Sequence, residues 1–481
     1  MVGMESRTKI VATLGPASEA PEVLDRLIVA GVDVVRLNLS HGSVDEHVHR
    51  MRAVRAAAER NGAIVGVLAD LPGPKVRAGQ LPRDGVQLVT GHQLVLRAGD
   101  GASTAEELSV DYGTLIDDLR VGDRVVIGDG AISLRVEKLG RDTATTRVIT
   151  GGTTQGRPGV HIPSERLRLH TPTAEDLRLA AIMAAEGVDF LAVSFVRAAA
   201  DLVKVRNAVA PHCPHLVAKI ETLPAVAALE EIAAEADAVM VARGDLGIEC
   251  PLEDVPHLQK RIVRHCVEMG VPVITATQML ESMITAPSPT RAEVSDIANA
   301  VFDGTDALML SAETAIGVDP VNVVEAMVRI AERAEMEASY SAWGNRLGRM
   351  QRRQWPEGPD RITMAITHAA GLAAVDAGAD AILCCTRSGR TTRAMARFRP
   401  TPKLIGLSPD PKALRTMTLS WGVTPLAVDT YSSTDELVWF AVETAAKHGL
   451  VATGQVVLVL AGAPDRVGTA ATDVLRIVQI S

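Results

Sequence analysis

Polar residues able to do chemistry stand at the ends of six of the eight short apolar runs in this chain of 481 residues. They are Arg36 with Asn38, Asp70, Lys219 with Glu221, Arg243 with Asp245, Thr275 with Thr277, and Ser311 with Glu313. One polar residue at the end of a run usually meets solvent and nothing more. Six such ends indicate a shared site, provided that the runs are strands whose ends meet.

Lys219 and Glu221 are two residues apart, so on a strand they point to the same side. A simple ion pair between them is one interpretation. Asp245, from the next run, favours another, because two carboxylates beside one ammonium make a hard-oxygen site suited to Mg²⁺, completed by water and substrate oxygens. The ammonium would then stand free to meet a phosphoryl group. Gly244 allows backbone N–H groups to approach a carboxylate or phosphate, although a plain turn would also explain it.

The eight runs are β-branched, and Ala/Leu/Glu/Arg-rich segments of helical period separate most of them. They cover residues 9–15, 32–38, 64–70, 189–195, 216–221, 237–245, 272–278 and 306–313. Eight such units predict a closed (β/α)₈ TIM barrel, whose active site forms at the carboxyl ends of the strands. Ser43 with Glu46 predicts a capping box for one helix, and Thr173 begins another.

The helical period disappears between the third and fourth runs, where Gly/Asp/Thr turns recur at short intervals. This predicts a small all-β domain at 71–165, inserted into a catalytic barrel made of 1–70 and 166–340. A polar stretch at 335–360 precedes a second βα series, with a helix at 361–377 and strands at 381–386, 403–408, 424–428 and 454–462. Residues 341–481 therefore should form a doubly wound α/β domain. No internal repeat is evident.

Composition excludes several classes of function. The formal net charge of −9 gives no basic surface for nucleic acid or an anionic membrane, and the 2% of aromatic residues leaves few rings to stack on bases. No apolar stretch reaches 18 residues, which predicts a cytoplasmic protein. The five cysteines are odd in number and lack C-x₂-C spacing, so we expect reduced, buried thiols.

Six segments carry a specific pattern: RLNLSHG (36–42), KIET (219–222), MVARGDLGIE (240–249), ATQMLESM (276–283), PTRAEVSDIANAVFDGTDALMLSAETAIG (289–317) and TRSGRTTR (386–393). ATQMLESM and LSAETA are the strongest of these signals, whereas the SGRT turn alone would be weak. In family order and over essentially the whole chain, they resemble the signatures of pyruvate kinases. The resemblance implies transfer of a phosphoryl group from phosphoenolpyruvate to ADP in glycolysis, with pyruvate and ATP as products, by a homotetramer.

The resemblance also assigns roles at the barrel mouth. Lys219 would stabilise charge on the phosphoryl group and then on the enolate, and Glu221 and Asp245 would hold Mg²⁺, with Mn²⁺ as an alternative. Arg36 would grip the phosphate of phosphoenolpyruvate. The backbone of Gly244 and Asp245 and the Thr277 hydroxyl would bind the substrate carboxylate, and the enolate would be protonated on the Thr277 side. The residues implied on the nucleotide-phosphate side are Asn38, Ser40, His41 and Arg77.

Two departures from the family pattern bear on ligands. Where many relatives have a lysine that reaches ATP, this chain has Pro158, and the adjacent Arg157 would have to supply that charge. A family glutamate is replaced by Lys75, as in the K⁺-independent branch. The residues implied for the cation pocket are Asn38, Ser40, Asp70 and Leu71, and we expect the Lys75 ammonium to replace K⁺ among them.

The late turn suggests a regulatory site, because hydroxyls, a glycine and a helix N-terminus make a phosphate cradle. Its residues are Thr386, Arg387, Ser388, Gly389, Arg390 and Thr391, with Lys403 and the loop at 462–469 as further candidates. A sugar phosphate or AMP would bind there and activate the enzyme. A surface turn without a ligand is the alternative.

Two other functions deserve a test. Mg²⁺-dependent aldolases and lyases of small 2-oxo acids also combine Lys, Glu and Asp at barrel strand ends, but a lid closing over ADP has no purpose in them. A non-catalytic regulatory relative would explain Pro158, but not the intact Lys219, Glu221, Asp245 and Thr277.

Overall fold

The computed structural model describes residues 6–128, 130–168, 170–338, 340, 344, 347, 359–430, 434–462 and 471–481. Its centre is a closed parallel barrel with the strand order β1-β16-β15-β14-β13-β12-β3-β2. The strands are β1 (Lys9–Thr13), β2 (Val34–Asn38), β3 (Gly66–Asp70), β12 (Phe190–Val193), β13 (His215–Ile220), β14 (Ala238–Ala242), β15 (Val273–Ala276) and β16 (Ala307–Leu310). Seven of them lie within the predicted runs, β13 begins one residue before its run of 216–221, and the predicted fold class is confirmed.

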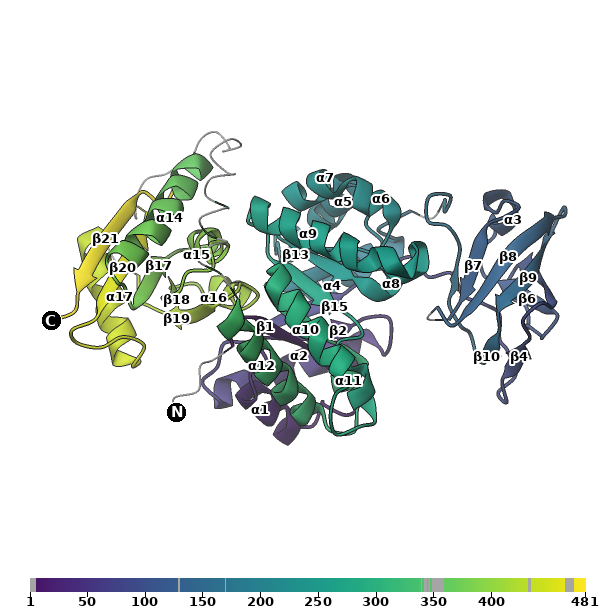
Figure 1. The fold of residues 1–481 in the computed structure, drawn as a ribbon, viewed down its shortest axis with the longest axis horizontal. Coiled ribbons are helices and arrows are strands. Elements are labelled where there is room, and N and C mark those ends of the chain that lie inside the picture. Colours follow the sequence, from purple (N-terminus) through teal and green to yellow (C-terminus); the bar gives the residue numbers. More distant parts are fainter. Residues whose placement is uncertain are drawn as a thin grey trace.

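Helices surround this barrel in the middle of the molecule (Figure 1). They are α1 (Pro21–Val29), α2 (Val44–Arg60), α4 (Ala174–Ala185), α5 (Ala199–Ala208), α6 (Leu223–Ala227), α7 (Leu229–Glu235), α8 (Arg243–Glu249), α9 (Val255–Met269), α10 (Arg291–Asp303), α11 (Ala312–Ala315) and α12 (Pro320–Glu337). Ser43 and Glu46 form the predicted capping box before α2, and Thr173 forms one with Asp176 before α4. These caps satisfy backbone N–H groups that a helix start leaves unpaired.

Strand side chains alternate between two apolar clusters. Val11 belongs to the cluster that fills the barrel, whereas its neighbours Ile10 and Ala12 pack in the cluster between strands and helices. This is the period-2 pattern of a sheet covered on both faces. Leu419, from the C-terminal part of the chain, joins the barrel-filling cluster.

Four aspartates repeat at the amino ends of alternate barrel strands, which we call the floor. Each carboxylate accepts a backbone N–H from the preceding strand in sequence, at 2.8 to 2.9 Å. Each aspartate N–H in turn donates to the carbonyl of that same residue. The pairs are Asp33 with Ile10, Asp189 with Val67, Asp237 with Leu216, and Asp306 with Val273. The barrel therefore does contain a four-fold structural repeat, although we expected none from the sequence.

A separate all-β unit extends from one side of the barrel (Figure 1). It has β4 (Val86–Leu88), β5 (Gln93–Ala98), β6 (Glu107–Val110), β7 (Arg124–Ile127), β8 (Ile132–Leu139), β9 (Thr143–Thr150), β10 (Gly152–Thr154), β11 (Val160–His161) and the short α3 (Leu115–Asp118). The unit has its own hydrophobic core. Its two connections meet at the barrel, where the Gly73 N–H donates to Asp176 Oδ1 at 2.9 Å across 103 positions of the sequence.

The C-terminal α/β unit lies on the opposite side of the barrel (Figure 1). Its sheet has the order β19-β18-β17-β20-β21. The elements are α14 (Pro359–Asp376), β17 (Ala381–Cys385), α15 (Arg390–Ala396), β18 (Lys403–Ser408), α16 (Pro411–Met417), β19 (Val423–Ala427), α17 (Thr434–Lys447), β20 (Val456–Ala461) and β21 (Val474–Gln479). We did not predict β21, which pairs antiparallel with β20 at the edge of the sheet.

Ion pairs join this C-terminal unit to the floor. Arg415 of α16 contacts Asp189 at 2.7 Å, and the buried Arg399 contacts Asp306 at 2.9 Å. Both aspartates belong to the four-fold repeat, so the same carboxylates fix strand register and anchor the C-terminal unit.

All five cysteines are unpaired. Four are buried as predicted, but Cys213 is exposed because it lies in the turn between α5 and β13. Among the described helices, none is both long and apolar enough to cross a membrane.

Candidate active site

A cavity of about 860 Å³ lies at the carboxyl ends of the barrel strands, which we call the mouth. The barrel contributes residues from several strand ends, and the inserted unit contributes Arg124, Gly159 and His161 to the same lining. This size and the convergence of charged groups are typical of a small-molecule site. Arg36, Asp70, Lys219, Glu221, Asp245 and Thr277 all line it.

Lys219 is the centre of a cluster of charges at this mouth. Its Nζ lies 2.7 Å from Glu221 Oε1, 3.2 Å from Asp70 Oδ1 and 2.7 Å from the hydroxyl oxygen of Ser194. Burial lowers the pKa of Lys219, but Asp70, Glu221 and Asp245 more than reverse this and raise it. The side chain is therefore a stable ammonium. From the sequence we expected this ammonium to be free. Instead, it is held between the carboxylates of Asp70 and Glu221.

Glu221 and Asp245 face each other in a buried setting. Burial raises the pKa of both carboxyl groups, while the Lys219 ammonium acts in the opposite direction. Glu221 Oε2 accepts the Phe195 N–H at 2.8 Å, but buried Oε1 has no hydrogen-bond partner, since its contact with Lys219 lacks that geometry. Two such carboxylates, with one oxygen unsatisfied, fit a divalent cation that takes its other ligands from water and substrate. Among the described residues, no group of three or more His, Cys, Asp or Glu side chains could hold a metal ion.

Arg36 is fixed by two contacts at the end of β2. Its Nε lies 2.7 Å from Asp70 Oδ2, and its Nη1 donates to the Thr13 hydroxyl at 3.0 Å. Burial would raise the pKa of Asp70, but Lys219 and Arg36 lower it overall. Asp70 thus stays ionised and holds two cations side by side, as binding a multiply charged phosphate requires.

Thr277 lies in a strained turn directly after β15. Thr277 and Gln278 both have positive φ angles, of 69° and 54°, which are uncommon for residues other than glycine. The Thr277 hydroxyl oxygen accepts the Gly244 N–H at 2.9 Å, and its proton is directed to the Ala276 carbonyl at 2.7 Å. The turn thereby places a hydroxyl beside the first residues of α8.

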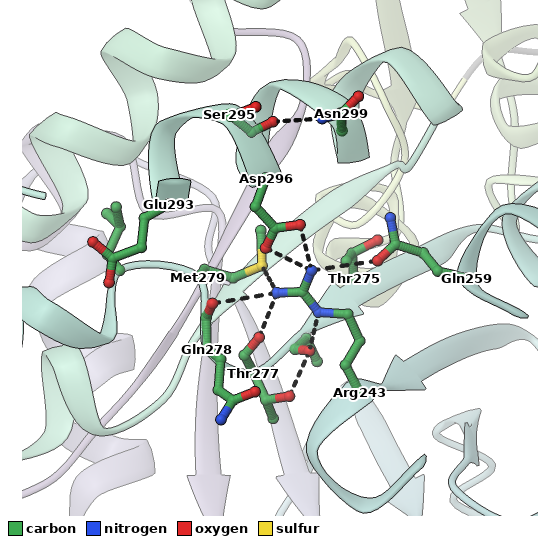
Figure 2. Close-up of polar contacts among 12 residues, drawn as sticks. Arg243, Gln259, Thr275, Thr277, Gln278, Met279, Glu293, Ser295, Asp296 and Asn299 are labelled. Atoms are coloured by element: carbon green, nitrogen blue, oxygen red, sulfur yellow. Dashed lines mark hydrogen bonds and ion pairs between the residues drawn. The ribbon is translucent and has the colours of Figure 1, made fainter. Parts of the chain in front are cut away.

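Arg243 holds this turn in place (Figure 2). Its guanidinium donates to the carbonyls of Ala276 at 3.2 Å and Thr277 at 2.6 Å, and its Nη1 contacts Asp296 of α10 at 2.7 Å. Its side chain is only 9% exposed. We placed Arg243 at a strand end but gave it no role, because the contact with Asp296 spans 53 positions of the sequence.

Asn38, Ser40, His41 and Arg77 also line the cavity, on the side of the inserted unit. Asn38 Oδ1 accepts the Ser40 N–H at 3.2 Å, and Lys75 Nζ donates to Ser40 Oγ at 2.7 Å. Burial lowers the pKa of His41, with further lowering from the charges of Lys75, Arg77 and Arg36. Leu71 is buried beside them and completes the residues expected around a monovalent cation.

Other predicted residues lie outside this cavity. Arg157 is not in its lining and instead contacts Asp111 of the inserted unit at 3.2 Å. Thr275 is fully buried and bonds to the Thr305 hydroxyl at 3.0 Å, away from the mouth.

The late turn lies in the C-terminal unit, between β17 and α15. The buried Thr386 hydroxyl accepts the Gly389 N–H at 3.0 Å, and Thr391 shares a hydrogen bond with Thr472 at 2.6 Å. Arg387, Ser388 and Arg390 are exposed. Lys403 donates to the Leu450 carbonyl at 3.3 Å, and residues 463–469 of the expected loop lie outside the described residues.

Sequence reasoning missed several supports of the site. Ser194 binds Lys219, and the Phe195 N–H binds Glu221. Glu313 is buried and accepts the N–H groups of Leu280 and Ser311, which braces the segment after Thr277. Of these, only Glu313 had been named from the sequence, by its place at the end of an apolar run, and it had been given no role.

Comparison with known families matches nearly the whole chain. Residues 5–324 match the model described as "Pyruvate kinase, barrel domain", and residues 364–478 match "Pyruvate kinase, alpha/beta domain".

Curated relatives point to the same family as these family models. The chain is 40% identical to "Pyruvate kinase" of Geobacillus stearothermophilus over 99% of its own length and 81% of the relative's. It is 40% identical to "Pyruvate kinase" of Sporosarcina psychrophila, over 97% of this chain and 79% of that one. Identity to "Pyruvate kinase" of Staphylococcus aureus (strain MRSA252) is 36%, over 98% of this chain and 80% of that one.

Proposed function

Because the chain belongs to the pyruvate kinase family, we propose that its barrel mouth transfers the phosphoryl group of phosphoenolpyruvate to ADP, giving pyruvate and ATP. The observation that carries this proposal is the Lys219 ammonium, held between the Arg36–Asp70 pair and the carboxyl groups of Glu221 and Asp245. Phosphoryl transfer depends on positioning and charge neutralisation more than on covalent chemistry. The cluster supplies both.

Arg36 and Lys219 would bind the phosphate of phosphoenolpyruvate. Asp70 and Thr13 occupy Arg36 Nε and Nη1, which leaves the third guanidinium nitrogen, Nη2, without an acceptor among the described residues. As the bond between phosphorus and the enol oxygen breaks, its electron pair stays on that oxygen. The Lys219 ammonium stabilises the phosphoryl group in flight and then this enolate oxygen.

Gly244, Asp245 and Thr277 would orient the substrate carboxylate. Thr277 Oγ accepts the Gly244 N–H, so this hydrogen bond connects the turn to the first turn of α8. The enolate then takes a proton on carbon from the Thr277 side, through water, and becomes pyruvate. By holding the Thr277 carbonyl, Arg243 keeps the Thr277 hydroxyl in position for binding of the substrate carboxylate and for protonation of the enolate.

Glu221 and Asp245 would hold Mg²⁺, or Mn²⁺ in its place. The unsatisfied Glu221 Oε1 and the raised pKa of both carboxyl groups support this assignment. When bound, the metal would supply positive charge that neutralises the phosphate.

ADP would lie toward the inserted unit, against Asn38, Ser40, His41 and Arg77. His161 and Arg124 reach the same cavity from that unit and would face the nucleotide. Arg157 reaches it only if its ion pair with Asp111 breaks, so we assign it no direct contact in this arrangement.

Lys75 would replace K⁺. Its ammonium lies 2.7 Å from Ser40 Oγ, in the group formed by Asn38, Asp70 and Leu71. Burial raises the pKa of Asp245 overall, and the Lys75 charge partly opposes this rise. A permanent charge at this position would do the work of a bound monovalent cation.

The late turn would bind a phosphorylated activator, a sugar phosphate or AMP, in a homotetramer. The exposed Arg387, Ser388 and Arg390 support an anion site there. Calorimetry with each ligand tests this, together with the kinetics of Thr391→Glu. No binding, with unchanged kinetics in the variant, would exclude regulation at this turn.

The principal test is a coupled assay of pyruvate formation from phosphoenolpyruvate and ADP. We expect turnover that requires both substrates and a divalent cation, and that is strongly reduced in Lys219→Met. An aldolase would instead release pyruvate from a larger 2-oxo acid without ADP. A folded protein that forms no pyruvate from phosphoenolpyruvate and ADP would overturn the proposal.

A further inference from the structure

Arg397 of the C-terminal unit is a buried cation that has no carboxylate partner among the residues that the structure describes. The residue is 4% exposed, and within the same residues its Nε and Nη2 have no hydrogen-bond acceptor. Burial lowers its pKa to about 10, with no charged neighbour contributing. Such a group is costly to bury, and proteins usually pair it.

Three more unsatisfied groups meet Arg397 around one small cavity, between the floor of the barrel and α15. Arg393 Nη1, Arg399 Nε and the hydroxyl of Ser420 are buried and unpaired, and all four residues line this cavity. The barrel supplies the other wall with Val271, Pro272 and the amino end of β16 at Asp306.

The carboxylates nearby are already occupied. Asp306 pairs with Arg399 at 2.9 Å and accepts the Val273 N–H. Its single negative charge therefore neutralises Arg399 and leaves none for the other arginines. Asp237 accepts the Leu216 N–H and contacts Arg206 at 3.4 Å. The carboxyl end of α9 lies against Arg397, since a Cβ on Gly270 would be 3.2 Å from its Nη1. That helix end offers about half a negative charge. Arg206 also pairs with Glu235 at 2.9 Å, and the Asp237 charge acts on Arg393. Arg397, on which no charged neighbour acts, therefore leaves a net positive charge around the cavity.

The size of the cavity limits what fills it. Its volume, about 10 Å³, is the space of one water-sized species. A water molecule has only two lone pairs, whereas Arg393, Arg397 and Arg399 present four unpaired N–H nitrogens. A monatomic anion can accept from all of them and also offsets the charge.

We propose that this cavity binds chloride, which links α15 of the C-terminal unit to the floor of the barrel through Arg393, Arg397 and Ser420. This anion site is separate from the mouth and from the late turn, and it stabilises the contact between the two units. Gluconate is too large to enter and serves as the inert counter-anion.

Thermal unfolding of the full chain in NaCl or sodium gluconate, at fixed ionic strength, tests the proposal. With chloride at ten times its dissociation constant, the unfolding equilibrium constant should fall about tenfold, and the stabilisation should grow with the logarithm of the chloride concentration above that point. Arg397→Met should lose this response. The matched control is Arg178→Met on α4, whose arginine is exposed and pairs with Glu175, and it should keep the response.

Bromide diffraction makes the test independent of whether Arg397→Met folds. Crystals of the unmodified protein soaked in bromide should show an anomalous peak in the cavity lined by Arg393 and Arg397. Identical unfolding in chloride and gluconate would overturn the proposal, as would a cavity that holds only water after the soak. A chloride response that Arg397→Met retains would overturn it too.

Discussion

At the floor of the barrel, Asp189 accepts the Val67 N–H and contacts both Arg55 and Arg415, so its charge is satisfied within the protein. At the mouth, Glu221 faces Asp245 and keeps one buried oxygen without a hydrogen bond. The two ends therefore use the same functional group differently. Floor carboxylates fix strand register and hold the C-terminal unit, whereas mouth carboxylates are left incomplete for ligands.

This contrast predicts that substitutions at the two ends separate activity from stability. Changes at the mouth should alter turnover and leave the fold almost intact, because the missing contacts are to ligands. Changes at the floor should lower the free energy of unfolding and leave turnover unchanged.

The largest effect should come from Lys219→Met at the mouth. Loss of the ammonium should lower kcat by roughly 10²–10⁴, about 3–5 kcal/mol in the barrier, with a modest change in substrate binding. The coupled pyruvate assay measures this. The floor control is Lys9→Met, whose lysine pairs with Asp33 at 2.9 Å and should keep its kcat. A Lys219 variant with half the original kcat would remove this residue from the mechanism.

Asp189→Asn should produce the largest effect at the floor. The substitution leaves Arg55 and Arg415 without a compensating charge and should lower the free energy of unfolding by about 3–5 kcal/mol. Urea denaturation gives the stability and the pyruvate assay gives kcat, which should stay within twofold. Glu175→Gln, which breaks only an exposed pair with Arg178, should cost far less. A stable Asp189 variant with impaired turnover would contradict the comparison.

His215, at the start of β13, should make stability depend on pH. Burial lowers its pKa to about 4, with Arg393 adding to the lowering. Because the unfolded chain binds this proton more readily, stability should be lost as the pH falls from about 6.5 to about 4, by on the order of 2–3 kcal/mol. Unfolding measured across this range should show a shallower slope in His215→Gln. An unchanged slope would assign the acid sensitivity to other groups.

Arg243→Lys should give a smaller effect on turnover. Lysine keeps the charge opposite Asp296 but cannot hold the Ala276 and Thr277 carbonyls at once, so the turn should relax from its positive φ angles. We expect kcat to fall about tenfold, or about 1.4 kcal/mol, with little change in melting temperature. Equal losses of stability and turnover would instead indicate a purely structural role.

Replacing K⁺ with another monovalent cation should have the smallest effect on activity. Activity in Na⁺ or tetramethylammonium should match that in K⁺ at fixed ionic strength, because Lys75 already supplies the charge beside Ser40. Lys75→Glu should lose activity that K⁺ partly restores. Tenfold activation of the unmodified protein by K⁺ would show that the ammonium does not replace the ion.

Local patterns predicted most of the barrel. The eight apolar runs and the caps at Ser43 and Thr173 depend on neighbouring residues, and the structure bears them out. The four-fold repeat was not recognised from the sequence. An aspartate does precede β2, β12, β14 and β16, but the shared role of these residues becomes clear only when the strands pair. The edge strand β21 was missed because its side chains show no regular alternation of burial.

The sequence predicted less of the site than of the barrel, because the geometry of the site depends on segments that are far apart in the sequence. The residue types at the strand ends brought Lys219, Glu221 and Asp245 together correctly. The state of the Lys219 ammonium depends on Asp70 and Ser194, which no local pattern connects to it. The role of Arg243 likewise follows from Asp296, on a helix of the following βα unit.

The hydrogen bond from Gly73 to Asp176 has a consequence for how such a protein could fold. It holds both ends of the inserted unit together, so the insertion replaces one loop between a strand and its helix without moving either. Closing a longer loop adds only about 0.6 kcal/mol of entropy cost for each doubling of its length. Because the inserted unit also has its own hydrophobic core, the barrel and this unit can fold as separate cooperative units.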